Sequence, residues 1–241
     1  MNQVLRCSTV LLLLATGPLA GQQPPSIPAF SVLESLDADN GWEPLEFPNI
    51  DRLTRYELVS EDGRQVVEAH TDDSASGMIY RVSLEPGDSL VLRWSWKVAN
   101  VLETGNARKK SGDDYPARIY VAFEFEPDKA GWFERAKRKT VSALFGEELP
   151  GKALNYIWAN RLPVGTQVPN PFTEDTVMIA VNSGSARVGE WVTVERDIVE
   201  DYRSAFGDDP PRLVGVAIMS DTDNTGGQAR AWYGDITLER P

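Results

Sequence analysis

The chain has 241 residues, with 36 Asp and Glu against 24 Lys and Arg, a net charge of −12, one histidine and one cysteine. This excess of acid disfavours nucleic acid as a partner, because both molecules would be negatively charged. A single histidine and a single cysteine exclude a zinc site built from several such ligands within one chain.

The first residues have the pattern of an export signal. Residues 10–15 are apolar, and Arg6 is the only charged residue nearby. An apolar run of this length is too short to span a bilayer. We therefore expect a signal peptide over residues 1–21, a proline-rich leader over 22–41 and a single domain over 42–241, in a periplasmic or secreted protein.

Short apolar runs separated by Gly, Asp, Asn and Pro occupy most of the expected domain. Residues 55–72 are typical of a β-hairpin with Asp62 and Gly63 in the turn. Further strands are expected at residues 78–84, 89–98, 117–126, 153–160, 176–184, 190–199, 212–221 and 230–239. So many strands with so little helix predict an all-β fold, an antiparallel β-sandwich of jelly-roll type.

Two segments interrupt the strands with helical patterns. Residues 129–145 carry apolar side chains on one face of a short amphipathic helix, and residues 135–139 are mostly basic. We interpret this helix as a cap on one end of the sandwich. A lid over an anionic ligand or a contact with a membrane is the less favoured alternative. A short helical turn is also expected within residues 202–212, stopped by Pro210 and Pro211.

Alternation along two strands indicates a binding face. Successive strand side chains point to opposite faces, so Trp94 and Trp96 belong to the core while Arg93 and Lys97 point outward. The same reasoning makes residues 119, 121, 123 and 125 core. The opposite face then carries a second set of outward residues, Arg118, Tyr120 and Glu124.

If the two strands lie close in one sheet, Arg93, Lys97, Arg118 and Tyr120 form a cationic and aromatic platform. Guanidinium groups pair with carboxylate or sulfate, and a ring can stack on a sugar. Glu124 lies on the same face, and Trp158 is a further stacking candidate or a core residue. An ordinary solvated face is the competing interpretation.

Catalytic alternatives have weaker patterns. A polysaccharide lyase could use Arg118 to neutralise a uronate, with Tyr120 or His70 as the base. A glycoside hydrolase needs two carboxylates, for which Glu124 and Asp114 are candidates. No nucleophile elbow accompanies His70, so a structural histidine is the favoured interpretation.

The stretch "DTDNTG" begins like a calcium loop. Asp221, Asp223 and Thr225 are spaced so that alternate oxygens could converge on one cation. The twelfth position of such a loop is normally Glu, but here it is Trp232. We expect Asp235 to replace the missing carboxylate, with Asp113 and Asp114 as less favoured ligands. Local turn hydrogen bonds are the alternative.

Several motifs in order, "LRWSWKV", "GDDYPARIYVAFE", "NYIWAN", "DYRSAFGDDPP" and "VGVAIMSDTDNTGGQARAWYGDI", resemble the bacterial, exported domain of unknown function 3047 family over residues 42–238. That resemblance implies no particular activity. The ending "AWYGDITLE" is similar to the last strand of jelly-roll carbohydrate-binding modules, which implies that Asp235 could help bind a structural calcium.

Together these patterns predict an exported, non-catalytic protein that binds a carbohydrate or another anionic envelope polymer. A lyase or hydrolase on the same fold is one alternative, and a structural or interaction protein of the periplasm is another. Calcium is the only cofactor that the residues suggest.

Overall fold

A computed structural model describes residues 26–128 and 151–241. The signal peptide and the amphipathic helix expected at residues 129–145 lie outside the described residues. One sheet contains β1 (Trp42–Leu45), β4 (Ala75–Leu84), β6 (Arg118–Phe123), β7 (Ala153–Ala159), β8 (Gln167–Pro169), β9 (Thr176–Ser183) and β11 (Leu213–Asp221). The other contains β2 (Arg55–Glu61), β3 (Arg64–Asp72), β5 (Val91–Val98), β10 (Val192–Asp197) and β12 (Gln228–Glu239). The helical elements are η1 (Phe30–Val32), η2 (Ala38–Asn40), η3 (Lys110–Gly112) and α2 (Ile198–Phe206).

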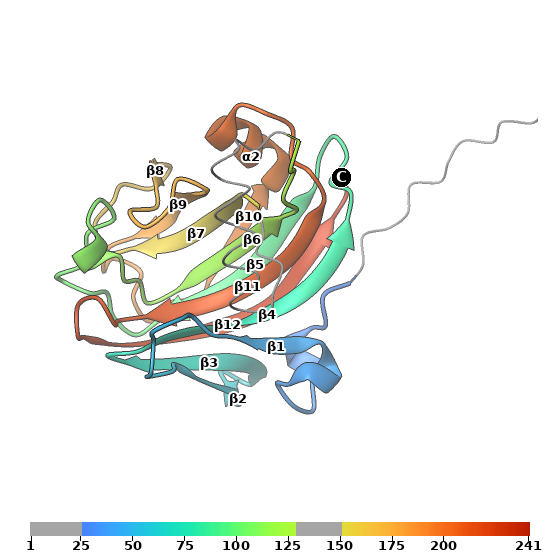
Figure 1. The fold of residues 1–241 in the computed structure, drawn as a ribbon. Helices are drawn as coiled ribbons and strands as arrows, with labels where there is room; N and C mark the ends of the chain where they lie inside the picture. Colours follow the sequence, from blue (N-terminus) through green and yellow to red (C-terminus); the bar gives the residue numbers. More distant parts are fainter. Residues whose placement is uncertain (1–25, 129–150) are drawn as a thin grey trace, which may run out of the picture.

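The two sheets pack face to face as a sandwich (Figure 1). The seven-stranded sheet has the order β1-β4-β11-β6-β7-β9-β8, and the five-stranded sheet has the order β10-β5-β12-β3-β2. Paired strands are antiparallel, except that β7 and β9 run parallel. The all-β, jelly-roll type of sandwich predicted from the sequence is confirmed.

The hairpin of β2 and β3 forms where the sequence predicts it. Asp62 has a φ of 51° and Gly63 a φ of 77°, so both central residues of the turn are left-handed. A two-residue turn of this kind matches the twist of the flanking strands, which fixes their register. Glu61 therefore pairs with Arg64 at the end of the ladder.

The core lies between the sheets and is rich in aromatic side chains. Trp94 and Trp96 on β5 are buried, with ring centroids 5.3 Å from Tyr156 and 6.0 Å from Trp158 respectively, both on β7. Asn182 on β9 accepts a 2.8 Å hydrogen bond from the indole of Trp96. Each such ring pair adds about 0.5–1.5 kcal/mol beyond its buried area. The alternation of β5 thus places its tryptophans in the core, as predicted.

Residues assigned to the leader on sequence also pack on this core. Ile27, Phe30 and Leu33 are buried among the core residues. The side chain of Gln65 on β3 donates 2.7 Å hydrogen bonds to the backbone carbonyls of Phe30 and Leu33. The segment from residue 27 onward is therefore held against the sandwich before β1 begins.

Helix α2 begins earlier than the sequence predicts. Residues 198 and 199 were expected to end a strand, but Asp197 caps a helix there by accepting hydrogen bonds from the N–H groups of Val199 and Glu200. Burial opposes ionisation of Asp197, yet these bonds and one from Ser89 hold its pKa below the ordinary 3.8. No helix among the described residues is long and apolar enough to cross a membrane.

Candidate functional site

The predicted cationic platform is not assembled. Arg93 and Lys97 lie on β5 of the five-stranded sheet. Arg118 and Tyr120 lie on β6 of the seven-stranded sheet. Since both strands turn their other face to the core, the two pairs point to opposite outer faces of the sandwich. The expectation that these strands lie close in one sheet was wrong, because strand pairing depends on contacts remote in sequence.

On the five-stranded sheet, the predicted cations are paired internally. Arg93 forms an ion pair with Glu195, its cross-strand neighbour on β10. Lys97 is buried, contacts Glu61 and Asp62, and lies 4.7 Å from the ring centre of Trp232. Burial disfavours the Lys97 ammonium, but the two carboxylates outweigh that effect and raise its pKa. Neither cation is left uncompensated for a ligand.

Two further predicted ligand residues also have structural roles. Glu124 receives hydrogen bonds of 2.8 and 2.9 Å from a guanidinium nitrogen of Arg212. Trp158 is fully buried, and its indole donates a 3.1 Å hydrogen bond to the carbonyl of Gly184. The open question about Trp158 is thus decided in favour of the core.

The polar residues of the motifs meet at one end of the sandwich. Because β6 runs antiparallel to β7 and β11, the start of β6 lies beside the ends of the other two strands. The loops at residues 99–117, 160–166 and 222–227 therefore gather there, on the left-hand side of Figure 1. We call this region the loop end.

Arg118 is the centre of a buried ionic network at the loop end. Its Nε donates a 2.8 Å hydrogen bond to Oδ1 of Asp221, and a second nitrogen contacts Oδ2 of the same carboxylate. Its Nη1 lies 3.6 Å from Oδ2 of Asp113, and its guanidinium lies 4.4 Å from the ring centre of Tyr115. Arg118 was expected to be exposed, but it is 1% exposed. It therefore fixes the loop end and does not face a ligand.

Tyr120 neighbours this network on the outer face of β6. Its hydroxyl lies 3.4 Å from Nη1 of Arg118, and burial raises its pKa to about 12. Asn155 on β7 lies opposite Tyr120 in register and is fully buried. Within the described residues, neither atom of the Asn155 amide has a hydrogen-bond partner.

The calcium-loop residues meet a different carboxylate from the one expected. Asp114 accepts hydrogen bonds from the backbone and side chain of both Asn224 and Thr225, at 2.6–3.2 Å. Asp114, Asp221 and Asp223 offer carboxylate oxygens within 4.8 Å of one another. Asp235 lies elsewhere, accepting bonds of 2.9 and 2.7 Å from the backbone and hydroxyl of Ser31.

The expected role of Asp235 was therefore misplaced, because seven residues of the extended β12 separate it from the loop. The three clustered carboxylates are nevertheless already engaged in part. Arg118 takes both oxygens of Asp221, and the 222–227 loop takes both oxygens of Asp114. Calcium binding stays a prediction, with Asp114 in the place assigned to Asp235.

Burial and like charge act on these carboxyl groups. Burial raises the pKa of Asp221 to about 8; Arg118 opposes the shift, and Asp114 and Asp113 add to it. Burial and the charge of Asp114 also raise the pKa of Asp223. The buried network at the loop end therefore contains more carboxyl groups than the guanidinium of Arg118 can pair with.

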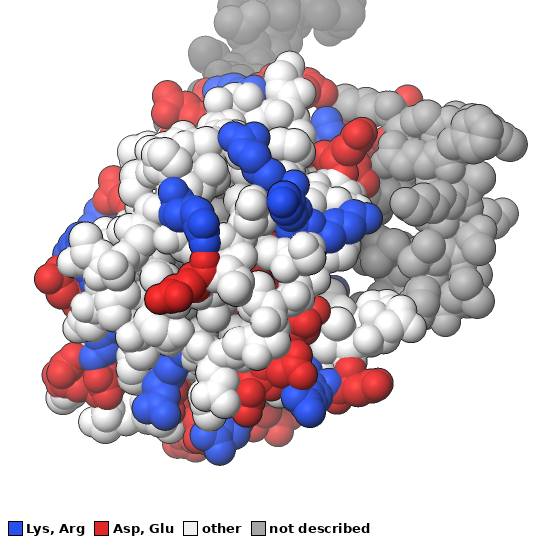
Figure 2. Space-filling view, turned by 90° about the vertical axis from the view of Figure 1, so that its left-hand side faces the viewer, with Lys and Arg blue, Asp and Glu red and all other residues white. Residues whose placement is uncertain are grey.

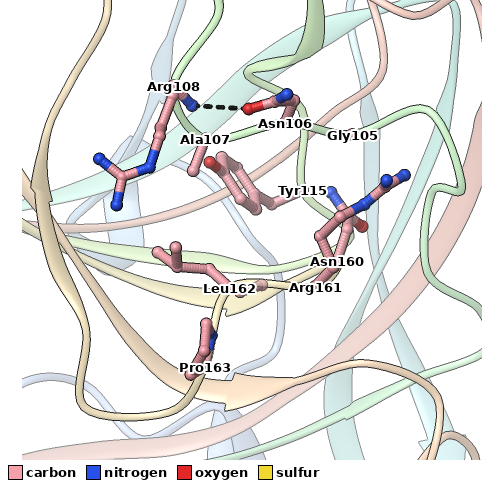
Figure 3. A pocket seen from close by; sticks show the side chains of 10 residues that line it. Gly105, Asn106, Ala107, Arg108, Tyr115, Asn160, Arg161, Leu162 and Pro163 are labelled. Atoms are coloured by element: carbon pink, nitrogen blue, oxygen red, sulfur yellow. Dashed lines mark hydrogen bonds between the residues drawn. The ribbon is translucent and has the colours of Figure 1, made fainter.

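A pocket of about 200 Å³ opens beside this network. Figure 3 shows that it lies between the 99–117 loop and the segment after β7, with the ring of Tyr115 between Arg108 and Arg161. Its wall is formed by ten residues, namely Gly105, Asn106, Ala107, Arg108, Tyr115, Ala159, Asn160, Arg161, Leu162 and Pro163.

Hydrogen bonds hold the pocket walls in place. Asn160 donates a 2.7 Å hydrogen bond to the carbonyl of Asp114 and accepts one of 2.8 Å from the N–H of Leu102. Asn106 accepts a 3.0 Å bond from the N–H of Arg108 (Figure 3). This pocket was not predicted from the sequence. Its only sequence signal is the basic run at residues 108–110 in an acidic chain.

Comparison with known proteins gives distant likenesses. The bifunctional purine biosynthesis protein PurH of Bacillus mycoides (strain KBAB4) is 27% identical over 124 residues, 48% of this chain. The chain spans about a quarter of that relative, with 24% of it covered. A family 12 xyloglucanase from Bacillus licheniformis in complex with ligand is 10% identical, with a TM-score of 0.45 over 89% of this chain and 99% of that chain. TmCBM61 in complex with β-1,4-galactotriose is 9% identical, with a TM-score of 0.36 over 88% and 99%.

A family model matches most of the chain. It spans residues 40–237, and so includes the strands of both sheets, the buried network and the loops that form the pocket. By this match the chain belongs to the family described as protein of unknown function (DUF3047).

Proposed function

We propose that this protein is an exported, non-catalytic binding protein that takes one residue of an envelope carbohydrate into the pocket at the loop end. The pocket carries the proposal, because its wall combines an apolar floor with polar groups at its edge. The C–H face of a sugar ring packs on such a floor, and its hydroxyl groups are left for the edge.

The size of the pocket supports a small ligand. Sites for drug-sized molecules and cofactors usually measure about 300–1,000 Å³. At about 200 Å³, this pocket suits a single ring of a longer chain, whose remaining residues would lie on the surface.

The chemistry of the wall supports binding without turnover. None of the ten residues around the pocket carries a carboxylate or an imidazole. Tyr115 could act as a lyase base only as a phenolate, and burial raises its pKa, so the phenol keeps its proton at neutral pH. These features favour a binding protein over a lyase that uses this pocket.

The residues nominated for catalysis elsewhere do not form a pair. Glu124 follows β6 and Asp114 precedes it, and six strand residues alone span about 20 Å. The carboxylates of a glycosidase lie about 5–9.5 Å apart. His70 lies on the five-stranded sheet, away from Arg118 in the other sheet.

A glycan array tests the proposal with the mature protein. We expect saturable binding by the wild type, loss of binding in Ala107→Trp, which fills the pocket from its wall, and retention in Val32→Trp. Val32 is 77% exposed on η1 and lies outside the pocket, so it controls for an added indole. Binding to no glycan, or equal binding by both variants, would reject the pocket and favour the structural-protein alternative.

A further inference from the structure

Four basic side chains in the pocket wall or next to it in sequence have no carboxylate partner, although the guanidinium of Arg161 donates to the backbone carbonyl of Glu103. We call them the basic rim: Arg108, Lys109, Lys110 and Arg161. All four are exposed, and Arg108 and Arg161 belong to the pocket wall. Within residues 26–128 and 151–241, none of them forms an ion pair with a carboxylate.

This lack of pairing differs from most of the described surface, where Arg64, which stacks on Trp191, is an exception. Exposed arginines elsewhere, such as Arg52, Arg93 and Arg203, each lie 2.5–2.7 Å from an acidic partner. Acidic residues outnumber basic ones in the chain, so a cation without a carboxylate partner is not explained by a shortage of carboxylates. Figure 2 shows basic side chains gathered near the centre of the face at the loop end. The basic rim is therefore a locally positive surface on an acidic protein.

The rim and the floor together specify a ligand chemistry. The floor offers Leu162, Pro163 and small apolar side chains, and the nearly buried ring of Tyr115 lies behind it. The rim offers two guanidinium groups on opposite sides of that ring (Figure 3). Guanidinium groups pair with carboxylates through two parallel hydrogen bonds, and an uncompensated positive surface also speeds the approach of an anion. A uronate residue presents both complements, an apolar ring face and a carboxylate.

A neighbouring aromatic ring extends this surface. Phe172 is 54% exposed, and the ammonium of Lys110 lies 5.2 Å from its ring centre. Phe172 and Lys110 thus form a second pair of an apolar ring and a positive charge, like the pair inside the pocket. An acidic chain longer than one residue would therefore meet the same chemistry at its next unit.

Resting on the proposed function, we infer that the pocket selects acidic saccharides. Arg108 and Arg161, on opposite sides of the pocket, bind the carboxylates of successive uronate residues, and one sugar ring packs on Leu162 and Pro163. Lys109 and Lys110 attract the rest of the polymer. This assignment replaces the platform of Arg93, Lys97 and Arg118, whose charges are neutralised by their neighbours.

Calorimetric titration with two matched probes tests the inference. The probes are α-1,4-linked tetragalacturonate and its carboxyl-reduced, neutral counterpart. We expect the wild type to bind the acidic probe at least about tenfold more tightly, a fold-change within reach of one charge-assisted hydrogen bond. Arg108→Gln with Arg161→Gln removes that preference, and raising the salt concentration reduces it.

Arg203→Gln is the control, because it removes one exposed positive charge on α2, outside the pocket. Equal affinity for both probes, or no saturable binding of tetragalacturonate, overturns the selectivity; neutral-glycan binding would then leave the proposed function standing. If Arg203→Gln loses the preference as fully as the double variant, only overall charge is at work and the site is wrong. Tighter binding to phosphatidylglycerol vesicles than to tetragalacturonate would assign the basic rim to a membrane surface and also reject the inference.

Discussion

Replacing Arg118 by Met should destabilise the protein strongly. At the 2.8 Å separation of Nε and Oδ1 of Asp221, the attraction between unit charges is about 6 kcal/mol at an effective dielectric constant of about 20. Removal of both ions from water offsets most of this attraction in the native pair. Removing only the cation leaves Asp221 and Asp113 buried and uncompensated, for which a cost of about 3–5 kcal/mol is typical.

Urea unfolding followed by tryptophan fluorescence measures this loss, since the core contains several buried indoles. We expect Arg118→Met to lower the free energy of unfolding by about 3–5 kcal/mol at pH 8. Arg118→Met combined with Asp221→Asn should recover part of the loss, because the closest buried charge is gone. Recovery is incomplete, because Asp113 also loses its cation.

The pH dependence gives the sign of the charge effect. Burial raises the pKa of Asp221 above its ordinary 3.8, so the folded state favours the protonated acid, and loss of Arg118 raises it further. The cost of Arg118→Met should therefore be smaller at pH 7 than at pH 9, because the lost cation matters only where the carboxyl of Asp221 would ionise. A cost below about 1 kcal/mol at pH 8, or a double variant no more stable than Arg118→Met, would refute the reasoning.

Three further perturbations test separate features. Asp197→Ala should lower the free energy of unfolding by about 0.5–2 kcal/mol by removing the cap of α2, whereas Asp197→Asn should retain most of the stability. Because the pKa of Asp197 is lowered in the folded state, the difference in stability between Asp197→Ala and the wild type should fade as the pH drops below 3.8. A difference that stays constant with pH would contradict an ionised cap. Asn155→Leu should raise the free energy of unfolding by about 1–2 kcal/mol, since the buried Asn155 amide has no hydrogen-bond partner among the described residues. Asn182→Leu should lower stability by removing the acceptor of the Trp96 hydrogen bond. A loss of stability in Asn155→Leu would show that its amide does form hydrogen bonds. Calcium at a hundred times its dissociation constant should add about 2.7 kcal/mol to the free energy of unfolding, seen as a rise in the melting midpoint over that in a chelator. Asp223→Asn should reduce this rise. If calcium does not move the wild-type midpoint, the calcium prediction is wrong.

The local pattern of the sequence predicted where most strands and turns lie, but not which strands pair with each other. Strict alternation identified Trp94 and Trp96 as core residues, and Asp62 with Gly63 located the hairpin turn, because both signals depend on neighbours in sequence. Alternation also assigned Arg118 to the outer face of its strand, yet it says nothing about which loops cover that face. Arg118 is buried because Asp113 and Asp221 arrive from segments about 100 residues apart.

The candidate site was harder to predict for the same reason. The sequence put Asp235 into the calcium loop because it lies close along the chain, whereas the extended strand carries it away to Ser31. Asp114 reaches the loop from more than a hundred residues upstream. The pocket combines loop residues near 108 with residues 159–163, and its apolar floor becomes visible only when β6 and β7 are paired.

The position of the last strand has a consequence for how the protein is made. β12 is the middle strand of its sheet, hydrogen-bonded to β5 on one side and β3 on the other. A chain that emerges from its amino terminus can form two separate ladders, β10 with β5 and β3 with β2, but it cannot join them until residue 239 has appeared. The native core therefore closes only after β12, which follows all the other described strands in the chain, has been made.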